Sequence, residues 1–278
     1  MQVMMAESAG FCYGVKRAVD MARETAKKCR HSVMLGSIIH NANVVAELEA
    51  LGMRKVDSWD QVRPGETVVI RSHGERKEVF ERLAAMGAAC VNATCPNVLR
   101  IQQLVAQAQE EGRTPLIIGE IHHPEVLGAA SWSERSVILP GPRELENWLN
   151  EEPSRRNMPL TATAQTTCVQ GIWESSKEIL KKQCTNAKIF DTICNATHRR
   201  QTEAAELAAQ VDVMVVVGDR KSANTKHLAE ICREKCGRVV QIERAGELSS
   251  ELFEGCLVAG LTAGASTPAG IIKEVYTT

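Results

Sequence analysis

The sequence has no run of the roughly 18 to 20 apolar residues needed to cross a bilayer, and its N-terminus, MQVMMAESAG, lacks the basic and then apolar stretches of a signal peptide. It also has no block of basic residues, and its formal net charge is -1. Nucleic-acid binding depends mainly on clustered Lys and Arg. These absences predict a cytoplasmic protein with no nucleic-acid or membrane partner, which acts on a small molecule or binds a protein.

No two cysteines are spaced as C-x-x-C, although the 278 residues include ten cysteines. The missing spacing counts against zinc ribbons, thioredoxin-like redox sites and ferredoxin-type clusters. A disulfide framework is also unexpected, because the cytosol keeps thiols reduced and a chain of this length does not need such cross-links. Any metal site must therefore combine cysteines that are far apart in the sequence.

Short apolar runs lead directly into loops of small or polar residues, and helical patterns lie between them. This alternation predicts an α/β fold with parallel sheets, in which the loops after the carboxyl ends of strands carry the ligand site. Turn chemistry alone would explain the Gly, Ser and Asn residues of these loops, but it explains the histidines less well. The six clearest runs with their loops span residues 33–41, 68–74, 115–125, 160–167, 213–224 and 257–266.

Three of the helical patterns begin just after a cysteine, at Cys12, Cys95 and Cys194. The strings GFCYGVKR, ATCPNVLR and TICNATHRR also place an arginine within six residues of each cysteine. The separations are similar, at 95 - 12 = 83 and 194 - 95 = 99 residues. We therefore expect three related α/β domains, which comprise residues 13–94, 95–192, and 193–278 together with 1–12.

A cysteine at a helix N-terminus is suited to metal binding, because unpaired backbone N–H groups and the helix dipole stabilise its thiolate. Three such thiolates can hold a cuboidal 4Fe-4S cluster through three irons and leave the fourth iron open as a Lewis acid. Spacing alone leaves a zinc site or a packing role open, because free cysteine is commonly buried. Cys232 and Cys236, one helical turn apart, could also chelate a metal, but no further ligand is apparent near them. Packing is the expected role of the remaining cysteines, Cys29, Cys90, Cys168, Cys184 and Cys256.

Three histidines, His40, His73 and His123, each end an apolar run. Equivalent strand ends suggest a common pole of the molecule, where the histidines could hydrogen-bond an anion. The phosphate-binding patterns G-x-x-x-x-G-K-S/T and G-x-G-x-x-G are absent. A phosphate group would therefore need His, Ser, Asn and backbone N–H donors.

Several short motifs occur together in a specific order: GFCYGV, IHN, RSHG, ATCP, HPEV, QTT, DTICNAT, KSAN and TAGAST, from residue 10 to residue 267. In this order and spacing the chain resembles the 4-hydroxy-3-methylbut-2-enyl diphosphate reductase family, also called the LytB family. The resemblance implies three pseudo-symmetric α/β domains in a cloverleaf around a central iron-sulfur cluster. It assigns to Cys12, Cys95 and Cys194 one 4Fe-4S cluster per chain, with the fourth iron open to substrate.

The implied activity is reductive removal of the hydroxyl group from (E)-4-hydroxy-3-methylbut-2-enyl diphosphate, the terminal step of the non-mevalonate isoprenoid pathway. Isopentenyl diphosphate and dimethylallyl diphosphate are the implied products. The sequence contains no flavin or nicotinamide fingerprint, so the electrons must come from an external donor such as ferredoxin or flavodoxin.

The resemblance also implies residue roles. It makes Glu125 the acid that delivers a proton, with Thr166 near the substrate hydroxyl; the alternative for Glu125 is a helix N-terminal acid that interacts with the dipole. The family often has two serines before the asparagine of KSAN, and the second is Ala223 here, so we expect weaker or rearranged diphosphate binding. The implied catalytic residues are Glu125, Thr166 and His123, and the implied substrate-binding residues are His40, His73, His123, Thr166, Ser222, Ala223, Asn224 and Ser266.

Two other functions remain open at this point. One is a zinc-dependent hydrolase with mixed Cys and His ligands, which iron and sulfide analysis would separate from the reductase. The other is a structural or redox-sensing iron-sulfur protein, which would normally supply four protein ligands to its cluster. Cys168, two residues after Thr166, is the one credible fourth ligand.

Overall fold

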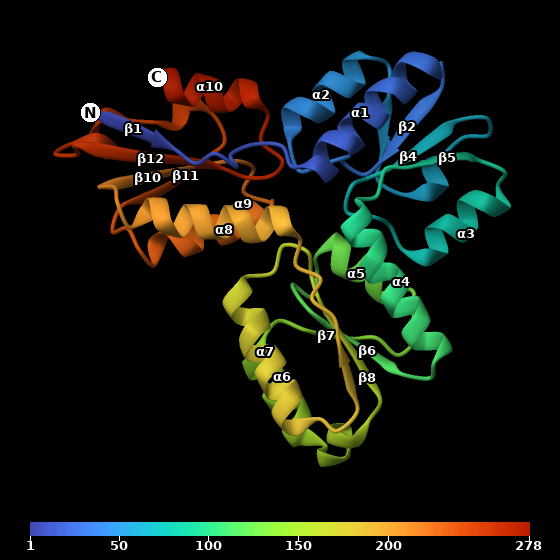
Figure 1. The fold of residues 1–278 in the computed structure, drawn as a ribbon. Coiled ribbons are helices and arrows are strands. Elements are labelled where there is room, and N and C mark those ends of the chain that lie inside the picture. The colour runs from blue at the N-terminus through green and yellow to red at the C-terminus, as the bar shows by residue number, and fades with distance from the viewer. The chain divides into compact units, whose positions relative to one another are not determined.

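The computed structural model describes all residues from Met1 to Thr278. The chain has twelve strands and ten α-helices, and a helix follows every strand except β3 and β11, which are followed by short 3-10 turns (Figure 1). The strands form three four-stranded sheets, and every pairing within them is parallel. This topology confirms the predicted α/β class with three parallel-sheet units.

The first sheet has the strand order β3-β2-β4-β5. Its two central strands, SVML and TVVI, are almost fully buried, as expected for parallel strands with both faces covered. The strands are β2 (Ser32–Leu35), β3 (Arg54–Val56), β4 (Thr67–Ile70) and β5 (Ala89–Asn92). The helices of this part of the chain are α1 (Tyr13–Lys28), α2 (Ala42–Ala50) and α3 (Lys77–Ala85).

The second sheet has the order β7-β6-β8-β9. Three of its helices begin with proline, whose fixed φ and missing N–H suit the first helical position. The strands are β6 (Thr114–Ile118), β7 (Val137–Leu139), β8 (Leu160–Ala164) and β9 (Ala187–Ile189). The helices are α4 (Pro96–Glu110), α5 (Pro124–Ala130), α6 (Pro142–Glu151) and α7 (Gln170–Gln183).

The third sheet has the order β11-β10-β12-β1, so the N-terminal strand completes a sheet whose other strands come from the C-terminal part of the chain. The strands are β1 (Gln2–Met5), β10 (Val213–Val217), β11 (Val239–Ile242) and β12 (Val258–Ala263). The helices are α8 (Asn195–Ala208), α9 (Ala223–Arg233) and α10 (Ala269–Thr277).

The three sheets share one strand order. With the strands of each sheet numbered along the chain, and β1 counted as the fourth strand of its sheet, all three read 2-1-3-4. The order is the structural counterpart of the three cysteine-containing repeats in the sequence; the domain limits 13–94, 95–192 and 193–278 with 1–12 stay predictions. Backbone proximity divides the chain into unit 1, residues 1–16, 40–44 and 194–278, and unit 2, residues 17–39 and 45–193.

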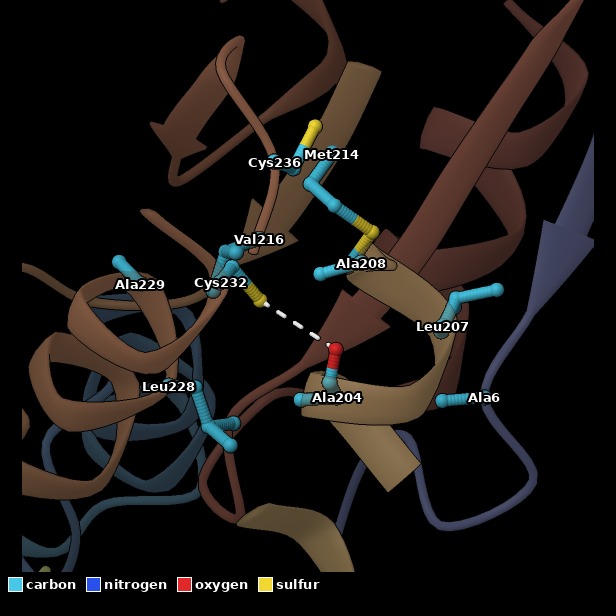
Figure 2. Packing of buried hydrophobic residues seen from close by; sticks show 10 residues of the cluster. All are labelled: Ala6, Ala204, Leu207, Ala208, Met214, Val216, Leu228, Ala229, Cys232 and Cys236. Atoms are coloured by element: carbon cyan, nitrogen blue, oxygen red, sulfur yellow. Dashed lines mark hydrogen bonds between the residues drawn. The ribbon is translucent and has the colours of Figure 1, made fainter. Parts of the chain in front are cut away.

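In unit 1, the helices α8 and α9 pack on the third sheet through a cluster of buried side chains that includes Cys232 and Cys236 (Figure 2). The Cys232 thiol donates to the carbonyl of Ala204 at 3.8 Å, and the Cys236 thiol donates to that of Arg238 at 3.3 Å. Burial raises the pKa of Cys232 to about 12, so its thiol keeps its proton at neutral pH. These contacts favour packing over metal binding for this pair.

No helix in the structure is both long enough and apolar enough to span a bilayer.

Candidate active site

Each sheet places a cysteine at the same topological position. Cys95 follows β5, Cys194 follows β9 and Cys12 follows β1, and these are the fourth strands of the three sheets. The carboxyl ends of parallel strands are where α/β folds place ligand sites. The cysteine repeat predicted from sequence therefore coincides with a repeat in topology.

The other predicted residues occupy two more repeated positions, the loops after the first and the third strand of each sheet. After the first strands β2, β6 and β10 come His40, then His123 with Glu125, then Ser222 with Asn224. After the third strands β4, β8 and β12 come His73, Thr166 and Ser266. Every repeat thus contributes polar groups from two loops and a cysteine from a third.

The cysteines stand at helix starts, as predicted. Cys95 and Cys194 are the N-cap residues of α4 and α8, and Cys12 directly precedes α1. The sulfur of Cys194 accepts a hydrogen bond from the backbone N–H of Thr197 at 3.3 Å, and the sulfur of Cys12 accepts one from Val15 at 3.4 Å. A backbone N–H directed at sulfur stabilises a thiolate, so these side chains fit the ligation of iron.

Cys12 and Cys194 belong to unit 1, and Cys95 belongs to unit 2. Within neither unit do three His, Cys, Asp or Glu side chains gather closely enough to hold a single metal ion. A tetrahedral zinc site built inside one unit therefore lacks its ligand set.

In unit 2, Glu125 and Thr166 form a buried pair. The carboxylate of Glu125 accepts hydrogen bonds from the Thr166 backbone N–H at 2.7 Å and from the Thr166 hydroxyl at 2.8 Å. Burial raises the pKa of Glu125 to about 7 against the opposing effect of these two donors, and the charge of Glu120 adds to the increase. The first helical turn of α5 thus presents an acid that is half protonated near neutral pH.

Gln165 joins the two loops that carry this pair, a role that the sequence did not predict. Its side-chain oxygen accepts from the backbone N–H of Glu120 at 3.0 Å, and its amide donates to the Thr167 hydroxyl at 3.0 Å. A Cβ at Gly119 would lie 2.8 Å from the Cβ of Gln165, so only glycine permits this approach. Gln165 is the first residue of the QTT motif. Its side chain contacts the backbone of Glu120, 45 positions earlier, so the motif alone did not reveal its role.

His123 is the N-cap of α5, and its Nδ1 accepts from the backbone N–H of Glu125 at 3.1 Å. An accepting Nδ1 carries no proton, so the ring proton of neutral His123 is on Nε2. The ring of His73 meets that of His123 edge-on, with centroids 5.7 Å apart. The structure therefore brings together four predicted residues of unit 2: His73, His123, Glu125 and Thr166.

Unit 1 holds the predicted serine and asparagine donors. Asn224 and Ser266 are 4% and 7% exposed, and neither the Asn224 Nδ2 nor the Ser266 Oγ has a hydrogen-bond partner in the protein. Buried donors without partners are uncommon and costly, so they mark a place where a ligand can supply acceptors. Ser222 differs, because its hydroxyl also accepts from the Thr225 backbone N–H and so caps α9.

Thr225 is a feature that the sequence did not suggest. Its side chain is fully buried, and its hydroxyl has no hydrogen-bond partner in the protein. A Cβ at Gly218 would lie 2.7 Å from this hydroxyl, and one at Gly264 would lie 2.1 Å from it. The two glycines let the loops after β10 and β12 close around the start of α9, beside Asn224.

Ala223 is the first residue of α9 and is buried, so this position offers no side-chain donor.

His40 begins the short segment of the first repeat that belongs to unit 1, and Asn41 starts α2 by accepting from the Val44 N–H at 3.1 Å. A polar cavity of about 470 Å³ in unit 1 is lined in part by Asn41, Arg220 and Thr267. These are sequence neighbours of predicted diphosphate contacts.

Fold and site together define a class: an α/β protein of three parallel sheets that presents cysteines at three helix starts and a buried carboxylic acid. A sequence model of the family described as LytB protein matches residues 3–278. The chain belongs to the LytB family.

Two relatives illustrate the family. The 4-hydroxy-3-methylbut-2-enyl diphosphate reductase of Caldanaerobacter subterraneus subsp. tengcongensis is 39% identical over 283 residues, which cover 99% of this chain and 95% of that protein. The protein of the same name from Anaeromyxobacter sp. strain K is 40% identical over 278 residues, which cover 99% of this chain and 97% of the relative.

Solved structures agree with the fold. A structure described as (E)-4-hydroxy-3-methyl-but-2-enyl diphosphate reductase, the terminal enzyme of the non-mevalonate pathway, superposes with a TM-score of 0.71 at 36% identity, over 100% of this chain and 98% of that one. The E-1-hydroxy-2-methyl-but-2-enyl-4-diphosphate reductase from Plasmodium falciparum gives a TM-score of 0.92 at 24% identity, over 99% and 87% of the two chains. The second likeness bears on fold alone.

Proposed function

We propose that this chain is an iron-sulfur reductase that converts (E)-4-hydroxy-3-methylbut-2-enyl diphosphate to isopentenyl diphosphate and dimethylallyl diphosphate. The observation that carries the proposal is the buried Glu125, whose pKa is raised to about 7 beside the Thr166 hydroxyl. Family membership supports the same substrate, because the relatives are named for this reaction.

The cofactor we propose is one 4Fe-4S cluster held by Cys12, Cys95 and Cys194. Its support is the shared position of the three cysteines after the fourth strand of each sheet, together with the backbone donors to two of their sulfurs. When bound, such a cluster supplies an open iron that acts as a Lewis acid and passes electrons to the substrate.

Side chains of the protein deliver the protons that the reaction consumes. Replacing the hydroxyl group by hydrogen consumes two electrons and two protons; one proton leaves with the hydroxyl as water and the other ends on carbon. Hydroxide is a poor leaving group, so the first proton must come from an acid close to the substrate oxygen. Glu125 is suited to this role because burial keeps a large fraction of it protonated at neutral pH. Thr166 holds the carboxyl in one orientation through two hydrogen bonds.

The diphosphate is bound by His, Ser and Asn side chains. His40, His73, His123, Ser222, Asn224 and Ser266 are the contacts that we propose. The support is the burial of Asn224 and Ser266 with side-chain donors that no protein group accepts. Hydrogen bonds to an ionised phosphate are about twice as strong as those between neutral groups, so a few such donors replace a Lys-Arg cluster.

The electrons come from outside the chain. We propose ferredoxin or flavodoxin as the donor, because the sequence has no fingerprint for a flavin or a nicotinamide cofactor.

The two alternative functions have less support. A zinc hydrolase would need a cluster of ligands that neither unit contains. A structural or sensing cluster would need a fourth cysteine, and the candidate, Cys168, packs among the buried apolar side chains of the second sheet. Its pKa is raised to about 12, mainly by burial, so its thiol is a poor ligand.

The test is anaerobic turnover of the substrate by the reconstituted protein with a strong one-electron donor. We expect both five-carbon diphosphates, with the rate of Glu125→Gln reduced roughly 100- to 10,000-fold at unchanged iron and sulfide content, as is typical for loss of a general acid. Glu134→Gln is the control, because Glu134 is exposed in the loop after α5. A protein that holds an intact cluster but gives no product would refute the reductase.

A further inference from the structure

Arg200 lies in the second turn of α8 and is only 4% exposed. Its guanidinium connects the two cysteine segments of unit 1. One Nη donates to the backbone carbonyl of Gly10, two residues before Cys12, and the other Nη donates at 3.3 Å to the carbonyl of Ala196, two residues after Cys194.

The charge of Arg200 is not neutralised by a carboxylate. Glu203, one turn further along α8, pairs with Arg199 at 2.7 Å and accepts from the Ser8 backbone N–H at 2.9 Å. The Nε of Arg200 is buried and has no hydrogen-bond partner in the protein. A buried cation with an unused donor is costly, so the surroundings of Arg200 suit an anion with acceptor atoms.

Cys12 and Cys194 indicate where such an anion would bind. Burial lowers the pKa of the Arg200 guanidinium, and the sulfurs of Cys12 and Cys194 oppose this decrease more strongly than Glu203 does. Arginine still keeps its charge under these conditions. A cuboidal cluster held by three thiolates carries net negative charge and gains another negative charge on reduction, and its sulfurs accept hydrogen bonds.

We infer that Arg200 is the counter-ion of the iron-sulfur cluster: its Nε donates a hydrogen bond to a sulfur of the cluster or of its ligands, and its charge favours the reduced state. The inference rests on the proposed function, because it needs the cluster at Cys12 and Cys194. Charge and hydrogen bonds near a cluster are known means of setting its reduction potential. In this inference Arg200 acts through the cluster and is a positioning residue.

The test compares reconstituted wild-type holoprotein with Arg200→Gln, Arg200→Lys and the control Arg199→Gln. Arg199 is the adjacent arginine on α8, but its side chain is 59% exposed, so water screens its charge. The readout is the midpoint potential from a redox titration followed by electron paramagnetic resonance. In Arg200→Gln we expect the equilibrium constant for reduction to fall on the order of tenfold or more, about 59 mV for one electron. Arg200→Lys should lie between Arg200→Gln and wild type, and Arg199→Gln should match wild type.

A second readout does not need Arg200→Gln, which loses the hydrogen bonds to the carbonyls of Gly10 and Ala196 and could fail to fold. In reduced holoprotein made with nitrogen-15-labelled arginine, electron-nuclear double resonance should detect an arginine nitrogen coupled to the cluster, and Arg200→Lys should abolish this coupling. A cluster-loaded wild type without the coupling, or a folded Arg200→Gln with wild-type potential, would overturn the inference and leave the proposed function standing. A wild-type protein that assembles no cluster would refute both.

Discussion

Glu125 and Thr166 are joined by two hydrogen bonds, in which the backbone N–H and the hydroxyl of Thr166 each donate to one carboxylate oxygen of Glu125. The two residues belong to different loops, after β6 and β8, and are 41 positions apart. Both donors favour the charged carboxylate, yet burial dominates and raises the pKa to about 7. The pair therefore holds an acid in one orientation without removing its proton.

Turnover should depend on pH through this acid. In the proposed role the protonated form of Glu125 delivers the proton, so kcat should fall as the pH rises through about 7. Thr166→Val removes the hydroxyl donor that lowers the pKa and keeps the backbone donor, so the decline should move to higher pH. The measurement is kcat against pH at constant cluster content. An unchanged midpoint in Thr166→Val would show that another group governs the decline.

Stability should also decrease with rising pH through the same group. The pKa of Glu125 in the folded state is raised above its ordinary value of 4.5, so the folded protein keeps a proton that the unfolded chain releases. Stability is then fully present below about pH 4.5 and decreases as the pH rises through about 7, by roughly 3 kcal/mol.

Glu125→Gln removes this titration. The unfolding temperature of the variant without cluster should therefore exceed that of the wild type by more at pH 8 than at pH 5, by calorimetry on matched samples. Glu134→Gln, which changes an exposed side chain, should give the same difference at both pH values. If Glu125→Gln also gives a pH-independent difference, the carboxyl does not carry the raised pKa.

The buried donors of unit 1 predict a separation between binding and stability. Asn224→Ala and Ser266→Ala each remove a donor that has no partner in the protein, so neither should lower the unfolding temperature. Each should raise the KM for the diphosphate substrate about 10- to 100-fold, because a hydrogen bond to a charged group contributes about 1.5 to 3 kcal/mol.

Ser222→Ala is the matched comparison, because Ser222 caps α9 through its hydrogen bond with the Thr225 N–H. It should raise KM and also cost about 1 kcal/mol of stability. Differential scanning fluorimetry gives the unfolding temperature of the three variants, and steady-state kinetics gives their KM. A loss of stability in Asn224→Ala comparable with that of Ser222→Ala would mean that Asn224 is a structural residue.

The cap of His123 and its proposed contact with the diphosphate can be separated by one substitution. Its Nδ1 caps α5 by accepting from the Glu125 N–H. Asparagine is a good N-cap, so His123→Asn should keep the unfolding temperature and raise KM, whereas His123→Ala should also lose about 1 kcal/mol. Equal stability of the two variants would remove the capping role.

The repeated architecture could be predicted from the sequence, because each repeat has the same local signals. The apolar runs before His40, His73 and His123 contain the strands β2, β4 and β6, and Cys12, Cys95 and Cys194 stand at helix starts. Periodicity and strand-end loops are properties of neighbouring residues, so a linear sequence displays them.

The contacts that tune the site could not be predicted, because they join residues that are far apart in the chain. The hydrogen bond from Arg200 to Gly10 spans 190 positions, and that from Glu120 to Gln165 spans 45. The close approach of Gly264 to Thr225 also joins the loop after β12 to the start of α9. Their local sequences look like ordinary turns, and only the packed sheets bring them together.

The one departure from the family motif gives the last prediction. Ala223 occupies the first position of α9, between Ser222 and Asn224, and it is 5% exposed. The resemblance implies that the family often has a second serine at this position, where this chain has only a methyl group, so we expect the diphosphate to lack one donor here. Ala223→Ser adds a single oxygen at a helix start, where serine is readily tolerated.

Ala223→Ser should therefore lower KM about 2- to 10-fold, the effect of one net hydrogen bond of about 0.5 to 1.5 kcal/mol, with kcat unchanged. Ala223→Val, which adds bulk without a donor, is the matched control and should raise KM. Steady-state kinetics on both variants, with equal iron content, separate a donor effect from a packing effect. If the serine and valine variants raise KM alike, position 223 has no room for a larger side chain. The diphosphate is then held by other donors alone.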